Sequence, residues 1–221
     1  MTQISLITPS PCSTCKSKKR LNSKNKGNVF ERQVAKQLSL WYSVERNDAV
    51  FYRTASSGTR GTQRFKRGQS AINSAGDLSF LHSEGEPFLQ CCAVEIKSGY
   101  PAATINRSLS STKPELLSFF TQAYESAHQA GVPCWMVIHK LDHQPPLLYC
   151  NVFLLTCYIQ ACCRYRDIPI PKSFDFSFFP FRVLLTSEKI GEVDTQIAIL
   201  KFDDFLTLDP AFFRPEHLFS K

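Results

Sequence analysis

Apolar residues recur at helical spacing near the start of the chain and again in its middle. Phe30, Val34, Leu38 and Trp41 lie on one face of a helix and predict an amphipathic helix over residues 29–43. A second helical series runs from Leu116 to Ala130, and Gly131 and Pro133 end it. Both helices have an apolar face that must pack against another element.

Strand-like segments lie between and after these helices. The apolar and β-branched content of residues 50–55, 76–81 and 88–98 is typical of strands. A turn at 83–87 joins the last two, so we expect them to pair as a hairpin. Residues 104–113 are polar and predict a loop before the second helix.

The segment 134–140 follows the second helix directly and predicts a further strand. A strand, a helix and a second strand in this order form a crossover that places two strands parallel in one sheet. The pattern is harder to interpret beyond this point. It predicts a core strand and helix within 147–163, strands near 181–186 and 196–202, and a short helix at 202–208.

Together these elements predict an α/β protein with a central mixed β-sheet flanked by helices. Residues 1–26 are rich in Lys, Ser and Pro and predict a flexible basic arm. We expect one domain over 27–221, with a core at about 27–140 and an elaboration at 141–221. The most apolar run, 147–163, is short and contains polar residues, so no membrane span is expected.

The net charge of +7 is unevenly distributed. Residues 1–76 carry 14 Lys and Arg against 3 Asp and Glu, whereas residues 77–221 carry 12 against 16. The basic half indicates a polyanionic partner, and nucleic acid is favoured over a membrane because no basic amphipathic helix accompanies it. Solubility alone is the simpler explanation.

The chain has nine cysteines, an odd number with adjacent pairs. This usage suits a reducing cytosol, in which most thiols act as small core residues. Cys12 and Cys15 form a CxxC, but a zinc site needs four ligands and no second ligand pair follows nearby. A zinc knuckle there remains an alternative to a simple tail.

Asp77, Glu95 and Lys97 are charged residues inside otherwise apolar strands. Side chains alternate along a strand, so Glu95 and Lys97 share one face, and Asp77 at the start of the neighbouring strand can approach Glu95. Two facing carboxylates stay ionised when a cation lies between them. Oxygen ligands suit Mg²⁺ or Mn²⁺, which can activate water for phosphodiester hydrolysis, and Glu31 on the first helix can add a ligand. Taken alone, an ExK pair is more often a solvated strand face.

The combined pattern resembles the PD-(D/E)xK nuclease superfamily, in particular archaeal Holliday-junction resolvases and related phage or prophage endonucleases. The matching segments are GNVFERQVAKQL at 27–38, FYRTASSG at 51–58, AGDLSF at 75–80, VEIKSG at 94–99 and FFTQAYESA at 119–127. The resemblance implies a restriction-endonuclease-like core over about 27–140. It does not explain the arm or the last third.

Residue roles also follow from the resemblance. It implies that Asp77, Glu95 and Glu31 bind the metal and that Lys97 is the catalytic lysine. Gln122 matches a glutamine that helps to form the active site in some branches, although it can equally be a surface residue. Arg53 and Ser57 match a basic residue and a hydroxyl placed beside the scissile phosphate. Gly76 stands where the superfamily name has Pro, a replacement that many members share.

A basic stretch lies between the first strand and Asp77. It contains Arg60, Arg64, Phe65, Lys66 and Arg67. We expect the cations to bind the phosphate backbone and Phe65 to stack on an unpaired base. Backbone contacts do not discriminate sequence, so selectivity for DNA structure is expected.

The function predicted from the sequence is that of a Mg²⁺-dependent endodeoxyribonuclease from a phage or mobile element. Its expected substrate is branched or duplex DNA, and the resemblance makes a homodimer a reasonable expectation. One alternative is a catalytically silent nucleic-acid-binding protein on the same fold. Another is an RNA-directed nuclease, because nothing in the basic stretch distinguishes a 2′-hydroxyl.

Overall fold

A computed structural model describes residues 23–54, 76–111, 114–172 and 176–218. Its centre is a five-stranded sheet with strand order β3-β4-β5-β7-β6. The strands are β3 (Cys92–Ser98), β4 (Cys134–Lys140), β5 (Leu147–Asn151), β6 (Leu184–Ile190) and β7 (Val193–Lys201). β3 and β4 run parallel and the other neighbours are antiparallel, so the predicted α/β class with a mixed sheet is confirmed.

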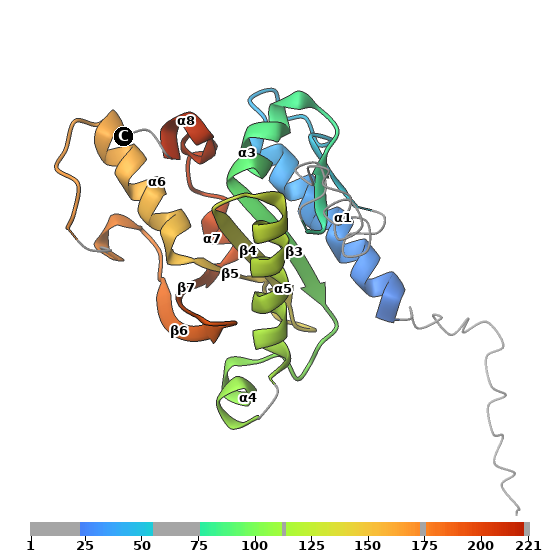
Figure 1. Ribbon diagram of the computed structural model, residues 1–221. Helices are drawn as coiled ribbons and strands as arrows, with labels where there is room; N and C mark the ends of the chain where they lie inside the picture. Colours follow the sequence, from blue (N-terminus) through green and yellow to red (C-terminus); the bar gives the residue numbers. More distant parts are fainter. Residues whose placement is uncertain (1–22, 55–75, 112–113, 173–175, 219–221) are drawn as a thin grey trace, which may run out of the picture.

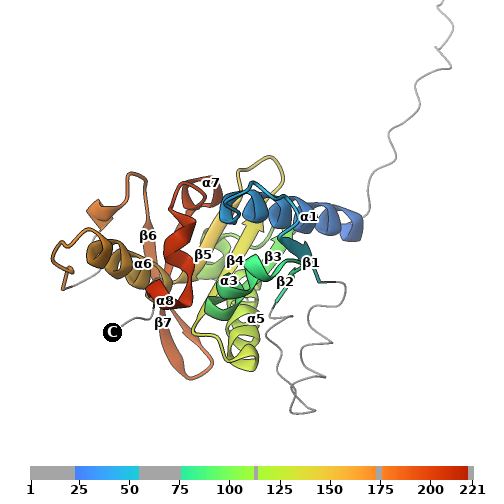
Figure 2. The same ribbon diagram turned by 90° about the horizontal axis from the view of Figure 1, so that it is seen from above.

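Helices cover both faces of this sheet (Figures 1 and 2). α1 (Ser23–Tyr42) and α5 (Glu115–Ala130) lie on opposite faces, and α6 (Val152–Tyr165) packs on the α1 side. The α1 face buries Val94, Ile96, Met136 and other apolar residues of the sheet. The α5 face buries Ala93, Trp135, Val137 and Tyr149 against the apolar stripe of α5. Alternation along the strands therefore supplies both layers of the core.

The β3–α5–β4 unit is the crossover that the sequence predicts. β4 occupies the predicted residues 134–140, and α5 ends at Ala130, followed by the cap residue Gly131, whose φ of 70° is left-handed. Such a conformation is the usual helix C-cap and favours glycine. Between β3 and α5, the segment predicted as a loop contains α4 (Ile105–Ser110), where the Thr104 hydroxyl accepts a hydrogen bond from the Arg107 amide at 3.3 Å.

The predicted hairpin between residues 76–81 and 88–98 is wrong. β2 (Leu78–Phe80) pairs antiparallel with β1 (Phe51–Arg53), and Gly76 before it forms an isolated parallel bridge with Val94 of β3. Residues 83–91 form a 3-10 turn (Ser83–Gly85) followed by the helix α3 (Glu86–Cys91). Pro87 in the first turn of α3 favours helix, whereas the mainly apolar run 88–94, interrupted by Gln90, is too short to separate a helix from a buried strand.

Apart from the strands β6 and β7, the last third of the chain packs largely on the α1 side of the sheet. α7 (Phe202–Phe205), a 3-10 turn (Pro210–Phe213) and α8 (Pro215–Leu218) follow β7, and another 3-10 turn (Phe176–Phe178) precedes β6. Trp41 of α1 contacts the rings of Phe205 and Phe213 and donates from Nε1 to the Leu208 carbonyl oxygen at 2.8 Å. The C-terminal segment thus completes the core around α1.

Two of the compositional expectations can be compared with the described part of the chain. Its seven cysteines are all free and buried, which agrees with their use as small core residues. Among the helices in the described ranges, none combines the length and apolar character needed to cross a bilayer.

Candidate active site

A hollow of about 610 Å³ opens beside the carboxyl end of β3. Its walls come from α1, the end of β1, the residue before β2, and the end of β3 with the turn that follows. They are formed by Gly27, Asn28, Glu31, Arg53, Asp77, Ile96, Lys97, Ser98, Gly99 and Tyr100. Four of the predicted site residues, Glu31, Arg53, Asp77 and Lys97, therefore meet at one place although they come from separate segments.

Glu95 lies directly behind this hollow. Its side chain is 1% exposed and points to the α5 face, while Val94 and Ile96 point to the α1 face, as the alternation predicts. One carboxylate oxygen, Oε2, accepts a hydrogen bond from Lys97 Nζ at 2.7 Å. The other, Oε1, accepts from the Ser126 hydroxyl of α5 at 3.0 Å. Both oxygens of this buried acid are thus bound.

Asp77 is fixed by the backbone of β3. Its amide donates to the Val94 carbonyl at 2.7 Å, and its Oδ2 accepts from the Ile96 amide at 2.8 Å. Lys97 Nζ lies 3.8 Å from the same Oδ2. The ammonium therefore stands between the two carboxylates that the sequence predicts to face each other.

Burial dominates the electrostatics of Glu95. It raises the pKa of this carboxyl from its usual 4.5 to about 7, and the nearby Asp77 charge adds to the rise, against the opposing effect of Lys97 and Ser126. Burial lowers the pKa of Lys97, but Glu95 and Asp77 outweigh it, so that the pKa is raised overall. Lys97 is therefore held as a cation, whereas burial shifts the pKa of Glu95 towards neutral pH and favours its protonated form.

Glu31 and Arg53 form an ion pair at the other wall of the hollow. Glu31 comes from the first turns of α1 and Arg53 is the last residue of β1, and both side chains are largely buried. Arg53 thus neutralises Glu31 and keeps further guanidinium donors available to an anion.

Three residues at the site were missed by the sequence reasoning. Ser126 binds Glu95, Tyr100 forms the rim of the hollow, and the Phe119 ring lies 5.9 Å from Lys97 Nζ and 5.0 Å from the Tyr100 ring. Phe119 and Ser126 fall within the motif at 119–127, and Tyr100 directly follows VEIKSG. Their position inside or next to these motifs was the signal in the sequence that could have marked them as site residues.

Of the remaining predicted residues, only Gln122 lies in the described part of the chain. Gln122 is partly buried on α5, one turn before Ser126, and within the described ranges it makes no hydrogen bond to the carboxylates. The nucleic-acid-binding candidates Ser57, Arg60, Arg64, Phe65, Lys66 and Arg67 lie outside the described residues. Cys12 and Cys15 lie outside them as well.

The donor set at the hollow is compatible with a hard divalent cation. Among the residues that the structure describes, no three or more His, Cys, Asp and Glu side chains lie close enough together to form a metal site, and Glu31 is paired with Arg53. Mg²⁺ needs only one or two carboxylates and keeps several waters. Asp77 and Glu95 meet this need, and the Lys97 ammonium between them shows that their arrangement favours a positive charge.

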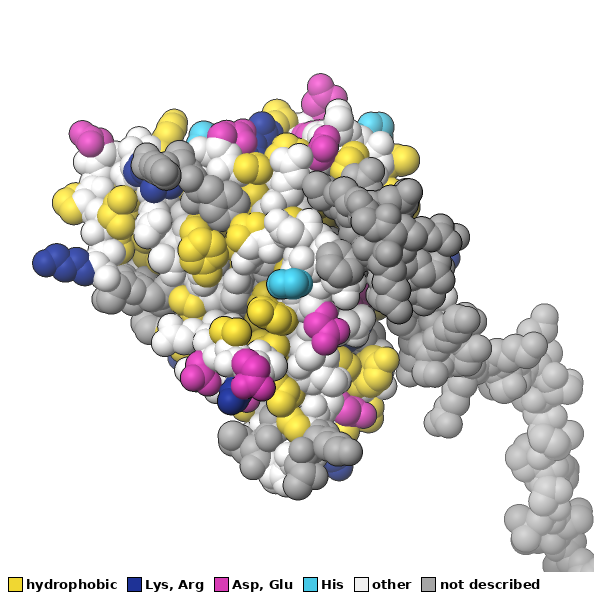
Figure 3. Space-filling model, in the orientation of Figure 1, with side chains coloured by type: hydrophobic (Ala, Val, Ile, Leu, Met, Phe, Trp, Pro, Cys, Tyr) yellow, Lys and Arg dark blue, Asp and Glu magenta, His cyan; other side chains and the backbone are white. Residues whose placement is uncertain are grey.

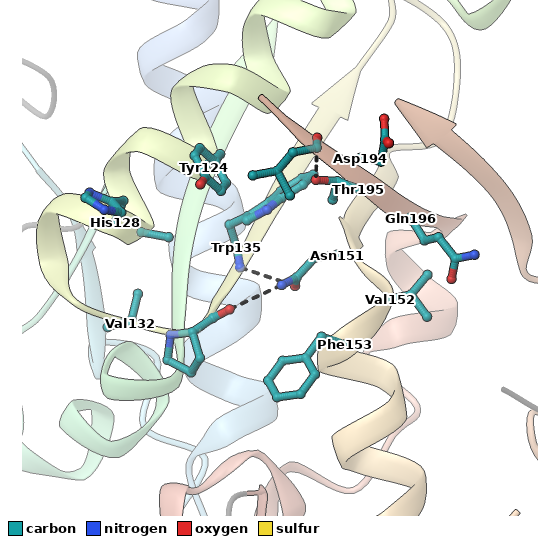
Figure 4. A pocket seen from close by; sticks show the side chains of 13 residues that line it. Tyr124, His128, Val132, Trp135, Asn151, Val152, Phe153, Asp194, Thr195 and Gln196 are labelled. Atoms are coloured by element: carbon teal, nitrogen blue, oxygen red, sulfur yellow. Dashed lines mark hydrogen bonds between the residues drawn. The ribbon is translucent and has the colours of Figure 1, made fainter. Parts of the chain in front are cut away.

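A second hollow, of about 470 Å³, has a different character (Figure 4). It lies at the opposite end of β4, between the end of α5 and the start of α6, and its walls are mainly apolar. Asn151 is fully engaged there, since it accepts from the Trp135 amide at 3.4 Å and donates to the Pro133 carbonyl at 3.2 Å. This hollow lacks the paired carboxylates and the lysine of the first one.

The surface over α5 carries few positive charges, so it is poorly suited to binding a polyanion. In Figure 3, acidic and apolar side chains lie around the middle of this face, and lysine and arginine side chains are sparse there. A nucleic acid is attracted to positive potential. The hollow beside β3 contains the positive side chains of Arg53 and Lys97, so of the two hollows it is the candidate active site.

One protein family matches the part of the chain that contains the hollow beside β3. A family model described as "Phage putative PDDEXK endonuclease" matches residues 22–151, which is more than half of the chain. The match includes every residue placed at the hollow. No curated protein and no solved structure matches the chain.

Proposed function

Because the chain belongs to the family of phage PDDEXK endonucleases, we propose that it is a metal-dependent endodeoxyribonuclease selective for DNA structure. One observation carries the proposal. Lys97 Nζ is hydrogen-bonded to Glu95 and lies 3.8 Å from Asp77, at a hollow that also contains Glu31 and Arg53. Three acids, a lysine and an arginine gathered in this way support a role in metal-dependent phosphodiester hydrolysis.

In this proposal Asp77 and Glu95 hold Mg²⁺ or Mn²⁺, and Glu31 adds a ligand or a hydrogen bond to a coordinated water. A bound ion of this kind polarises a phosphoryl oxygen and lowers the pKa of a water molecule. Lys97 then stabilises the negative charge that develops on the phosphate. Arg53 orients the same phosphate through the donors that Glu31 leaves free.

Binding of DNA away from the scissile bond is assigned to the basic stretch that contains Arg60, Arg64, Phe65, Lys66 and Arg67. The described residues at its two ends support this. Arg53 and Asp77 both line the hollow, and the Thr54 amide donates to the Asp77 carbonyl at 3.0 Å. Replacing Arg64, Lys66 and Arg67 together by Ala should weaken binding and reduce its salt dependence, and an unchanged salt slope would contradict the assignment.

The proposal is tested with purified protein and end-labelled substrates. A four-way junction, a flap, a linear duplex and a single strand are each incubated with Mg²⁺ or EDTA, beside matched RNA. The variants are Lys97→Ala, Glu95→Ala and the control Lys189→Ala, whose side chain is exposed on β6. Metal-dependent cutting that the first two variants lose and the control keeps is the expected result.

Other outcomes separate the alternatives. Binding without cutting, with both Mg²⁺ and Mn²⁺, would indicate a silent nucleic-acid-binding protein, and cutting confined to RNA would indicate an RNA-directed nuclease. Symmetric cutting of both strands of a junction would accord with the proposed homodimer. Light scattering measures that assembly directly.

A further inference from the structure

Ser126 makes an unusual contact for a serine in a helix. Such hydroxyls commonly bond a backbone carbonyl of the preceding turn. On the same helix, Thr121 donates to the Leu117 carbonyl at 3.0 Å and Ser118 to the Glu115 carbonyl at 2.6 Å. Ser126 instead donates across to Glu95 on β3, 31 residues earlier in the chain.

We propose that Ser126 is a positioning residue, which holds Oε1 of Glu95 so that Oε2 is the oxygen presented to the divalent cation. The inference rests on the proposed function, because it assumes that Glu95 is a metal ligand. Its basis is the division of contacts at the carboxylate, with Ser126 on one oxygen and Lys97 on the other.

The two contacts differ in what happens when a cation enters the hollow. Lys97 Nζ is positively charged and lies between Asp77 Oδ2 and Glu95 Oε2. A divalent cation that entered this space would repel the ammonium and would compete with it for Oε2. The Ser126 hydroxyl is neutral and binds the oxygen on the other side. It can therefore retain Glu95 after Lys97 has released it.

The position of Ser126 is fixed by packing. Its neighbours Ala123 and Ala127 are buried against the sheet, at 0% and 4% exposed, and both belong to the core cluster that includes Ala93 of β3. A serine side chain is short, so little freedom remains once α5 is docked. Hydrogen-bond partners of metal-binding carboxylates typically change metal affinity or activity by about 10–100-fold when removed.

The test uses three variants of the full chain. Ser126→Ala removes the hydroxyl, Ser126→Thr retains it, and Ser118→Ala is a control that removes an exposed hydroxyl from the same helix. Mn²⁺ binding is measured by titration calorimetry without DNA. The Mg²⁺ concentration for half-maximal cleavage, kcat and the KM for DNA are measured on the best substrate.

We expect Ser126→Ala to bind Mn²⁺ about 10-fold more weakly and to need correspondingly more Mg²⁺, with an unchanged KM for DNA. Ser126→Thr and Ser118→Ala should stay close to the wild type. A purely structural role would lower only the unfolding midpoint. Unchanged Mn²⁺ affinity and Mg²⁺ requirement in Ser126→Ala would overturn the proposal, as would an equal effect of Ser118→Ala.

The outcomes also distinguish this inference from the proposed function. If the wild type binds Mn²⁺ but cuts no substrate, the nuclease proposal fails while the calorimetry still decides the role of Ser126. If the wild type cuts with Mg²⁺ and Ser126→Ala is unaffected, only the positioning role fails. Should Ser126→Ala not fold, Ser126→Cys keeps the volume with a weaker donor, and the same criteria apply to it.

Discussion

At the scale of single residues, Glu95 is the most constrained group of the candidate site. The carboxyl is buried, and its pKa rises to about 7 although Lys97 and Ser126 favour its charged form. Without a metal, the folded protein therefore binds a proton that the unfolded chain has released at the same pH. The linkage between protonation and folding makes the stability of the apo protein depend on pH.

The sign of this dependence follows from the raised pKa. Below about pH 4.5 the carboxyl is protonated in both states, and between about 4.5 and 7 only the folded state keeps the proton. Protonation of Glu95 therefore stabilises the folded state in acid, and this stabilisation is lost as the pH rises from about 4.5 through 7. Glu95→Gln, which cannot ionise, should gain stability relative to the wild type between pH 5 and pH 8, by on the order of 1–3 kcal/mol.

Urea unfolding in EDTA at several pH values measures this difference. Glu192→Gln is the control, because its side chain is 97% exposed and it should leave the pH profile unchanged. His139 is also buried, and burial lowers its pKa to about 4, but it acts equally in both proteins and cancels. Parallel profiles for the wild type and Glu95→Gln would contradict the raised pKa.

At the scale of elements, the junction between β2 and β3 depends on Gly76. Its φ is +76°, and a Cβ built there would lie 2.3 Å from the Val94 carbonyl oxygen. The close approach lets Asp77 bond the backbone of β3 on both sides of Glu95. Proline, which fixes φ near −65°, cannot adopt this conformation, and this accounts for glycine before Asp77.

Gly76→Ala should destabilise the protein by more than about 2 kcal/mol, because left-handed strain and a backbone overlap act together. Gly131→Ala is a matched control, since its φ is +70° but nothing lies within 4 Å of the added Cβ. The control should cost only about 1 kcal/mol. Equal losses in urea unfolding would mean that the contact with Val94 is unimportant.

The elements best predicted from sequence are those in which local and tertiary signals agree. β4 is an apolar run that follows Pro133 directly, and its predicted bounds are exact. The run 88–94 is also mainly apolar, with Gln90 as its one polar residue, yet it splits into the end of α3 and the start of β3, because so short an apolar run carries no periodicity that separates helix from strand. The partner of β2 depended on a long-range pairing that no local pattern encodes.

The same distinction applies to the site. Alternation along β3 correctly placed Glu95 and Lys97 on one face, since it is a local property of any strand. The Ser126 contact to Glu95 and the Glu31–Arg53 pair depend on how α5 and α1 dock, so they became visible only in three dimensions. The family resemblance supplied the nearby segments but not these contacts.

At the scale of the whole molecule, the family match ends at residue 151, but the core does not. Residues beyond 151 supply α6, two strands of the sheet and the rings around Trp41. We therefore propose that residues 27–221 form one folding unit. A chain that ends at Asn151 should lose cooperative unfolding, whereas retention of a sharp urea transition would show that the matched region folds alone.

A point substitution tests the same proposal without deleting any segment. Phe213 is fully buried, and its ring lies 5.3 Å from that of Trp41 and 5.0 Å from that of Tyr158. Phe213→Ala should cost about 3–5 kcal/mol and change Trp41 fluorescence in the folded protein, because α1 and the C-terminal segment share this cluster. Phe153→Ala removes a ring that is 49% exposed and should cost about 1 kcal/mol or less. If Phe213→Ala is as mild as this control, the C-terminal segment is an appendage to the region that the family model matches and not a part of its core.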